Sequence, residues 1–171
     1  MFLPTKNPPH KKQRDLAKEQ DRERMISLAI EENTHFSVST MEFERAGITY
    51  SIDTMEQLKK QHPDNKYFFI IGADSLFQLE SWHRAESLLA STSFLVATRD
   101  EHPYEEMKHF SKQLTEKYKA DISFLTTPNI EIAARALRER VKKGKSIAYY
   151  VPEKVREYIQ FHRLYQEEKK I

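Results

Sequence analysis

A run of apolar residues at positions 67–71 constrains the fold of this chain more than any other stretch. It lies between a charged turn, residues 62–66, and a bend at Gly72, and it lacks the alternation of a half-exposed strand. It therefore predicts a strand that is buried on both faces. Asp74 and a helix begun by Ser75 should follow. Open α/β sheets bind ligands at this carboxyl edge, so we look for the function there.

Two further apolar runs predict partners for this strand. They cover residues 93–98 and 122–127, and a charged helix at about 105–118 separates them. Strands that alternate with helices are typical of a parallel sheet with crossover connections. The fold class we predict is therefore α/β.

Local patterns predict the other elements. Residues 2–4 resemble the end of a strand. The alternation in residues 36–43 predicts a strand nearer the sheet edge, with Phe36, Val38 and either Met41 or Phe43 inward. The helices we expect are 15–32, one through 55–59 capped by Asp53 or Thr54, an interrupted helix over 75–89, 131–143, and one that begins after Val151-Pro152.

Composition limits the classes of function. The 171 residues suit one domain, 1–171, and the excess of 28 basic over 26 acidic residues, a net charge of +2, is too small for a protein that holds nucleic acid mainly through its phosphates. No apolar run is long enough to cross a bilayer, and no cysteine occurs. We therefore expect a cytoplasmic protein with no nucleic-acid or membrane partner. Whether it forms a homo-oligomer stays open.

A loop and a turn contain candidate ligand-binding groups. The proline-rich loop 5–12 carries Lys6, His10, Lys11 and Lys12, which could grip a phosphate or could form a solvated basic run. In the turn at 47–54, Thr49 and Ser51 flank Tyr50. The Tyr50 ring could face a bound ring system or could belong to the core.

The predicted sheet edge contributes two more candidates. Asp74 follows the central strand directly, and Trp82, the single tryptophan, lies at the break in the following helix. A lone tryptophan often packs in a core, but this one is placed to stack on a heterocycle. His83 and Arg84 suit surface groups, and Arg99 ends the strand 93–98. Together these groups suit a nucleotide better than a peptide or a lipid.

Several chemistries lack their sequence signatures. The seven histidines show no paired spacing of the kind a zinc site uses, so we predict no metal held by protein side chains. No GxSxG motif occurs, and three glycines are too scattered for a phosphate-binding glycine loop.

Five blocks of the sequence resemble one enzyme family. In order they are FLPTKNPPHKK, DRERMISLAI, GITYSIDT, FFIIGADSLFQLESWHR and YYVPEKVREYI, and they extend from Phe2 to about Tyr165. Their order and spacing resemble the bacterial nicotinate-mononucleotide adenylyltransferases, which join ATP to nicotinate mononucleotide in NAD synthesis. The resemblance implies a doubly wound parallel sheet of the Rossmann-like nucleotidyltransferase type, with Mg²⁺ carried by the ATP phosphates.

The resemblance also implies roles for particular residues. Thr49, Tyr50 and Trp82 would surround the nicotinate ring, His10 and Lys11 would lie near its phosphate, and Asp74 would meet the adenosine side.

Two departures from the family fall on the ATP side. The GGTFDPxHxGH stretch does not occur, so the resemblance implies that the first strand and helix are missing and that the domain is incomplete at its N-terminus. The ISSTxxR signature stands here as residues 132–138, with Ala133, Ala134 and Arg135 in place of three hydroxyls and only Arg138 left to meet phosphate.

We therefore expect weak adenylyltransferase activity or none from this polypeptide alone. The alternative is a noncatalytic nucleotide-binding or partner-binding derivative of the family. A related adenylyltransferase acting on another phosphate fits Tyr50 and Trp82 less well.

Overall fold

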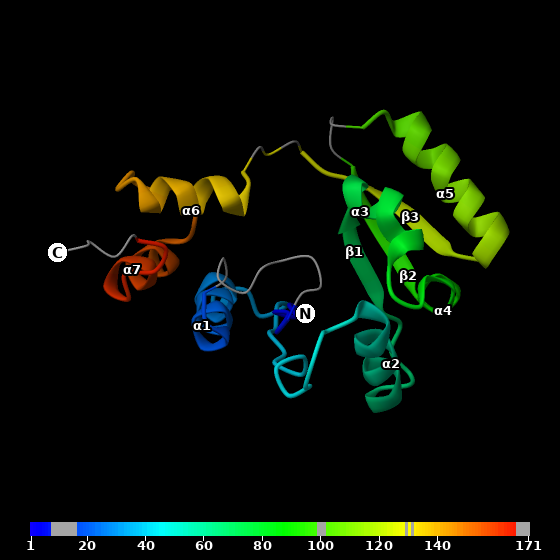
Figure 1. Cartoon of the computed structure of the whole chain (residues 1–171), viewed down its shortest axis with the longest axis horizontal. Coiled ribbons are helices and arrows are strands. Elements are labelled where there is room, and N and C mark those ends of the chain that lie inside the picture. The colour runs from blue at the N-terminus through cyan, green and yellow to red at the C-terminus, as the bar shows by residue number, and fades with distance from the viewer. Residues whose placement is uncertain (8–16, 99–101, 129, 131, 167–171) are drawn as a thin grey trace. The chain divides into compact units, whose positions relative to one another are not determined.

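A computed structural model describes residues 1–7, 17–98, 102–128, 130 and 132–166 of the chain (Figure 1). These residues group into two compact units. We call Tyr50–Ile130 the sheet unit, and Met1–Thr49 together with Glu131–Ile171 the terminal unit. The prediction of one domain over 1–171 stays a prediction.

The sheet unit contains the parallel sheet that the sequence predicts. Its strands β1 (Phe68–Gly72), β2 (Ser93–Thr98) and β3 (Asp121–Thr126) pair in the order β1-β2-β3, all parallel. The register sets Phe69 beside Phe94 and Phe94 beside Ile122. The α/β fold class is confirmed.

Helices connect the strands. The chain passes from β1 to β2 through α3 (Ala73–Gln78), the short 3₁₀ helix η2 (Leu79–Ser81) and α4 (Ala85–Ser91), and from β2 to β3 through α5 (Tyr104–Tyr118). Helix α2 (Ser51–Gln61) precedes β1 and packs against α4. The break that we predict at Trp82 is therefore present.

The core of the sheet unit lies on one face of the sheet. Phe94 and Val96 of β2 are almost completely buried there, beneath Leu76, Leu79 and other apolar side chains of the helices. The aromatic rings of Phe69 and Phe94 meet edge to face with their centroids 6.0 Å apart. This packing fixes the strand ends that carry the candidate site.

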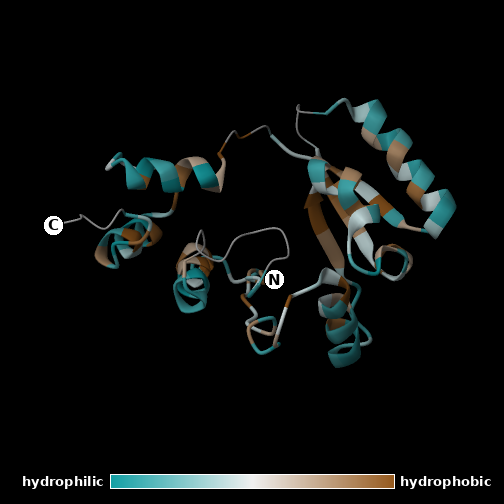
Figure 2. Ribbon diagram, viewed as in Figure 1, coloured by the Kyte–Doolittle hydropathy of each residue, from teal (hydrophilic) through white to brown (hydrophobic). Residues whose placement is uncertain are grey.

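The prediction that β1 is buried on both faces is wrong. Ile71 is buried, but Phe68 is 48% and Ile70 is 65% exposed, although Figure 2 shows the whole strand as hydrophobic. Side chains alternate between the faces of a strand, and only the face with Phe69 and Ile71 has helices of this unit against it. The sequence correctly indicated that β1 is apolar on both faces. It could not indicate which of the two faces the helices cover.

The terminal unit is helical. Helices α1 (Glu19–Ile30) and α7 (Glu153–Phe161) pack together, and α6 (Ala134–Lys142) joins the same core. The core is built on Ile147, Val155 and Ile159, with Met25 and Leu28 of α1 against it. The Tyr158 hydroxyl donates to Asp21 across the helix pair at 2.9 Å.

The strand predicted at 36–43 is reduced to one bridge. Phe2 and Val38 pair in parallel, and Phe2 exchanges backbone hydrogen bonds with Ser37 and Ser39. Residues 41–43 form a turn instead. Phe36, predicted to point inward, is 49% exposed and meets the ring of Phe2 edge to face. A strand needs a ladder of hydrogen bonds, and within the described residues this segment pairs only with Phe2.

Two helices begin earlier than the sequence predicts. Tyr50 is the N-cap of α2, so Asp53 and Thr54 lie within the helix and do not cap it. Helix α3 begins at Ala73, with Gly72 as its N-cap, rather than at Ser75. Within the described ranges, no helix is both long and apolar enough to span a membrane.

Candidate functional site at the carboxyl edge of the sheet

The carboxyl edge of β1 carries Asp74 in the first turn of α3. Its side chain is 74% exposed, and its Oδ1 atom lies 2.9 Å from Nε2 of His102. The ring of His102 also rests on Phe77 of α3, with centroids 5.1 Å apart. The carboxylate of Asp74 therefore faces solvent, and its orientation is set by its position on α3 and by its contact with His102 in the segment before α5.

His102 is a candidate that the sequence reading missed. We could interpret no pattern in the loop at 100–104. The available signal was its position after β2, because parallel strands bring their carboxyl ends to the same edge of a sheet. That rule places residues following β2 near residues following β1, as the Asp74–His102 pair illustrates.

Tyr50 lies against the residue that follows Trp82. The Tyr50 ring and the His83 imidazole are stacked, with centroids 4.0 Å apart and planes inclined by 24°. Both Tyr50 and Trp82 are partly exposed. The start of α2 and the segment after η2 are thus joined within the sheet unit, although 33 sequence positions separate the two rings, from 50 to 83.

Trp82 packs against the sheet and is partly exposed. Its ring and that of Phe69 meet edge to face, with centroids 6.2 Å apart. An aromatic side chain that is held by one neighbouring ring and is partly exposed can stack on a planar ring with little loss of side-chain entropy.

Thr49 directly precedes Tyr50 and ends the first stretch of the terminal unit. Its N–H donates to the Asn7 carbonyl at 3.2 Å. Its side chain is 5% exposed, and the described residues give the buried hydroxyl no hydrogen-bond partner. A buried hydroxyl without a partner is costly, and a ligand that offers an acceptor would relieve that cost.

The first cation of the predicted basic loop has a structural contact. The ammonium of Lys6 donates to the Phe43 carbonyl at 2.7 Å, and Asn7 donates from its side chain to the Gly47 carbonyl at 2.9 Å. Lys6 therefore ties two loops of the terminal unit together. His10, Lys11 and Lys12 lie outside the described residues, as does Arg99.

The segment that carries the substituted signature begins α6. Ala133 is the N-cap of this helix and makes no side-chain capping bond, and Ala134 and Arg135 are exposed at its first turn. Arg138 lies one turn further on and is half-buried, and its charge lowers the pKa of nearby Tyr165 against the larger effect of burial, which raises it. The helix thus begins without hydroxyl donors.

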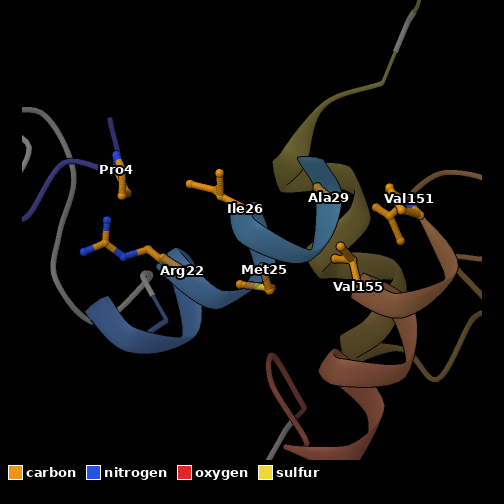
Figure 3. Close-up of a pocket in the computed structure, with 8 residues that line it drawn as sticks. Pro4, Arg22, Met25, Ile26, Ala29, Val151 and Val155 are labelled. Atoms are coloured by element: carbon orange, nitrogen blue, oxygen red, sulfur yellow. The ribbon is translucent and has the colours of Figure 1, made fainter. Parts of the chain in front are cut away.

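The terminal unit also contains an open apolar hollow of about 370 Å³ (Figure 3). Residues of α1, including Met25, Ile26 and Ala29, line it together with Val151 and Val155. Its one charged group is Arg22, whose guanidinium donates to the carbonyls of Thr5, Lys6 and Ala17. Because those N–H groups are already engaged, the hollow does not suit a phosphate or a nucleobase.

The sheet unit carries two groups of side chains that suit a flat, polar molecule. Asp74 and His102 lie at the carboxyl edge of the sheet. Tyr50, His83 and Trp82 form an aromatic group in which Trp82 contacts Phe69, the second residue of β1. In the part of the chain that the structure describes, no three His, Asp or Glu side chains gather in a way that could hold a metal ion.

Comparisons with known proteins give a consistent result. The family model described as cytidylyltransferase-like matches residues 1–159. A probable nicotinate-nucleotide adenylyltransferase of Lachnoclostridium phytofermentans is 48% identical over 96% of this chain and 82% of its own length. One of Bacillus pumilus with the same description is 34% identical over 96% of the chain and 81% of its own length.

Solved structures share the fold. A Plasmodium falciparum nicotinic acid mononucleotide adenylyltransferase complexed with NaAD matches with a TM-score of 0.74 at 18% identity, covering 95% of this chain and 80% of that one. The same protein complexed with APC matches with a TM-score of 0.69, also at 18% identity, over 88% of this chain and 77% of that one. The Rossmann-like nucleotidyltransferase fold is therefore confirmed.

Proposed function

The chain belongs to the nicotinate-nucleotide adenylyltransferase family of NAD biosynthesis, and we propose that it transfers AMP from ATP to nicotinate mononucleotide with release of pyrophosphate. The observation that carries the proposal is sequence identity that extends over nearly the whole chain. A phosphate oxygen of the mononucleotide would attack the α-phosphorus of ATP. The bond from that phosphorus to the bridging oxygen breaks, and its electron pair leaves with pyrophosphate.

We propose that the sheet unit contributes to binding of the two nucleosides, with the pyridine side at Tyr50 and Trp82 and the adenosine side at the carboxyl edge of β1. Trp82 would stack on the pyridine ring and Tyr50 would bound it, with the Thr49 hydroxyl as a donor to the ligand. Three observations support these roles: Trp82 and Tyr50 are both partly exposed, and the buried Thr49 hydroxyl has no hydrogen-bond partner among the described residues. Asp74 would meet the adenosine side, which its exposure and its contact with His102 support.

The phosphates require cationic partners. We propose His10 and Lys11 for the mononucleotide phosphate and Arg138 for an ATP phosphate, on the basis of the resemblance in sequence. Mg²⁺ would enter bound to the ATP phosphates and would offset their negative charge. Because no metal-binding cluster occurs among the described residues, we assign no protein ligands to the ion.

Catalysis would depend on alignment and charge rather than on a covalent intermediate. Holding the attacking and leaving oxygens in line converts a reaction between two molecules into one within a complex. Donors aimed at the developing charge lower the barrier further. The exposed alanines at the start of α6 cannot donate from their side chains, so we propose that this chain is weak on the ATP side.

A pyrophosphate-release assay with ATP and nicotinate mononucleotide tests the proposal. Mononucleotide-dependent release that disappears in Trp82→Ala would support it. Nicotinamide mononucleotide serves as the matched control substrate, because it differs only in carrying an amide in place of the carboxylate, and we expect slower turnover with it.

Binding measured by calorimetry distinguishes the noncatalytic alternative. Binding of nicotinate mononucleotide without pyrophosphate release, with and without Mg²⁺, would indicate a binding protein. Absence of both binding and release would contradict the proposed function.

A further inference from the structure

Arg84 joins the segment after Trp82 to helix α2. Its guanidinium donates to both carboxylate oxygens of Glu56, at 2.6 and 3.1 Å, and lies 3.6 Å from Asp53. Both acidic residues lie on α2, which begins directly after Tyr50. The planar fork of an arginine matches a carboxylate in this two-bond geometry, which fixes direction as well as distance.

The contact connects the two aromatic groups of the proposed site. Arg84 is two residues after Trp82, and Asp53 is three residues after Tyr50. The stack of His83 on Tyr50 is a second contact between the same two segments. Helices α2 and α4, which these segments begin, also pack against each other (Figure 1). The separation of Trp82 from Tyr50 is thus held at two points.

The backbone of Arg84 is in an unfavourable conformation. It has φ 52° and ψ 44°, the left-handed region that a residue with a Cβ atom rarely adopts, and it is the N-cap of α4. The carboxylate of Glu56 raises the pKa of Arg84 through their hydrogen bonds. The ion pair is nevertheless about half exposed, with 44% and 50% of the two side chains accessible.

Global stability does not explain this arrangement. Exposed ion pairs contribute little to the free energy of unfolding, and a non-glycine residue in the left-handed region costs free energy. Glycine would meet the backbone requirement at no steric cost. The backbone of Arg84 costs free energy, and its ion pair adds little to the free energy of unfolding. Such an arrangement is typical of a binding site whose geometry must be fixed before the ligand binds.

We propose that Arg84 is a positioning residue that holds Trp82 at the separation from Tyr50 that the pyridine ring of the mononucleotide requires. The inference rests on the proposed function. Arg84 itself would not touch the ligand. Its loss should therefore raise the KM for nicotinate mononucleotide and leave the KM for ATP nearly unchanged, whereas general loosening of the fold would raise both.

Three substitutions distinguish the effect of the Arg84–Glu56 ion pair from the effect of the left-handed backbone at Arg84. Glu56→Gln weakens the contact from α2 without altering the Arg84 backbone. Arg84→Gly removes the contact and relieves the left-handed strain, and Arg84→Lys keeps the charge but loses the two-bond geometry. Lys112→Gln is the matched control, because Lys112 forms an exposed ion pair with Glu116 at 3.8 Å on α5 of the same unit.

Trp82 supplies the readout, because it is the only tryptophan of the chain. Quenching of its fluorescence by nicotinate mononucleotide gives the dissociation constant, and its anisotropy reports indole mobility without any ligand. We expect Glu56→Gln and Arg84→Gly to lower the anisotropy and to weaken mononucleotide binding about 10-fold, with Arg84→Lys intermediate. Lys112→Gln should behave as the wild type.

The outcomes separate the two proposals. Unchanged anisotropy and unchanged mononucleotide binding in both Glu56→Gln and Arg84→Gly would overturn the positioning role. Equal weakening of ATP and mononucleotide binding would overturn it as well, because it would indicate a general structural effect. The wild type could fail to bind the mononucleotide while the Trp82 anisotropy still falls in the variants. That result would mean that the Arg84–Glu56 pair fixes Trp82 but that nicotinate mononucleotide is not the substrate.

Discussion

Asp74 and His102 lie 2.9 Å apart, from Oδ1 to Nε2, although 28 positions separate them in the sequence. Each follows a different strand of the parallel sheet, Asp74 after β1 and His102 after β2. Neither belongs to the hydrophobic core, so their pairing depends on the register of β1 against β2. The sheet therefore supplies the geometry of this polar pair.

We predict that His102→Ala weakens ATP binding more than mononucleotide binding. The substitution removes the partner that orients Asp74, and one hydrogen bond of this kind contributes about 0.5–1.5 kcal/mol, so the KM for ATP should rise up to about 10-fold. Steady-state kinetics with each substrate varied in turn measures the effect. His109→Ala, an exposed histidine on α5 that contacts Gln113, is the control. An unchanged KM for ATP would argue against the adenosine role of Asp74.

We predict that hydroxyls restored at the start of α6 increase activity. The triple substitution Ala133→Ser, Ala134→Ser and Arg135→Thr would supply donors at a helix N-terminus and should raise kcat about 10-fold or more. Ala133→Ser alone should stabilise the terminal unit by about 1 kcal/mol, because Ala133 is an N-cap without a capping bond. Pyrophosphate release and urea denaturation measure the two effects. Ala136→Ser, exposed within the same helix, is the control, and equal rates in all variants would refute the prediction.

We predict that Tyr165 makes the terminal unit less stable at alkaline pH. Burial against the core of this unit raises the pKa of Tyr165 above its usual value of 10.0. As pH rises through 10, the unfolded chain therefore loses its proton first, and the free energy of unfolding falls. Tyr165→Phe should remove this part of the alkaline loss in denaturation followed by circular dichroism. Tyr149→Phe, at a fully exposed tyrosine, should keep the wild-type pH profile.

We predict that Phe94→Ala strongly destabilises the sheet unit. Phe94 is 1% exposed at the centre of the sheet, and its loss should cost about 3–5 kcal/mol through the cavity that it leaves. Urea denaturation followed by Trp82 fluorescence measures this, because Trp82 packs on Phe69 and Phe69 packs on Phe94. Phe161→Ala, 84% exposed in the terminal unit, should leave the transition unchanged. A cost below about 1 kcal/mol for Phe94→Ala would mean that the site collapses readily.

The elements that local sequence can specify agree with the structure. The apolar runs predicted β2 and β3 nearly to the residue. Helical periodicity predicted α1, α5 and α6 within a few residues at each end, and Val151-Pro152 predicted the start of α7. The predictions failed where a distant partner decides the outcome. Residues 36–43 alternate like a strand but have only Phe2 to pair with, and β1 is apolar on both faces with helices of its unit against only one.

The sequence by itself determined the fold class, the family and the aromatic candidates Tyr50 and Trp82, because apolar periodicity and conspicuous residues are local properties of the chain. Only the tertiary structure showed that His83 stacks on Tyr50, that Arg84 is paired with Glu56, and that His102 contacts Asp74. These contacts join residues 28 or more positions apart. Such contacts arise from strand register and helix packing, which local residue patterns do not encode.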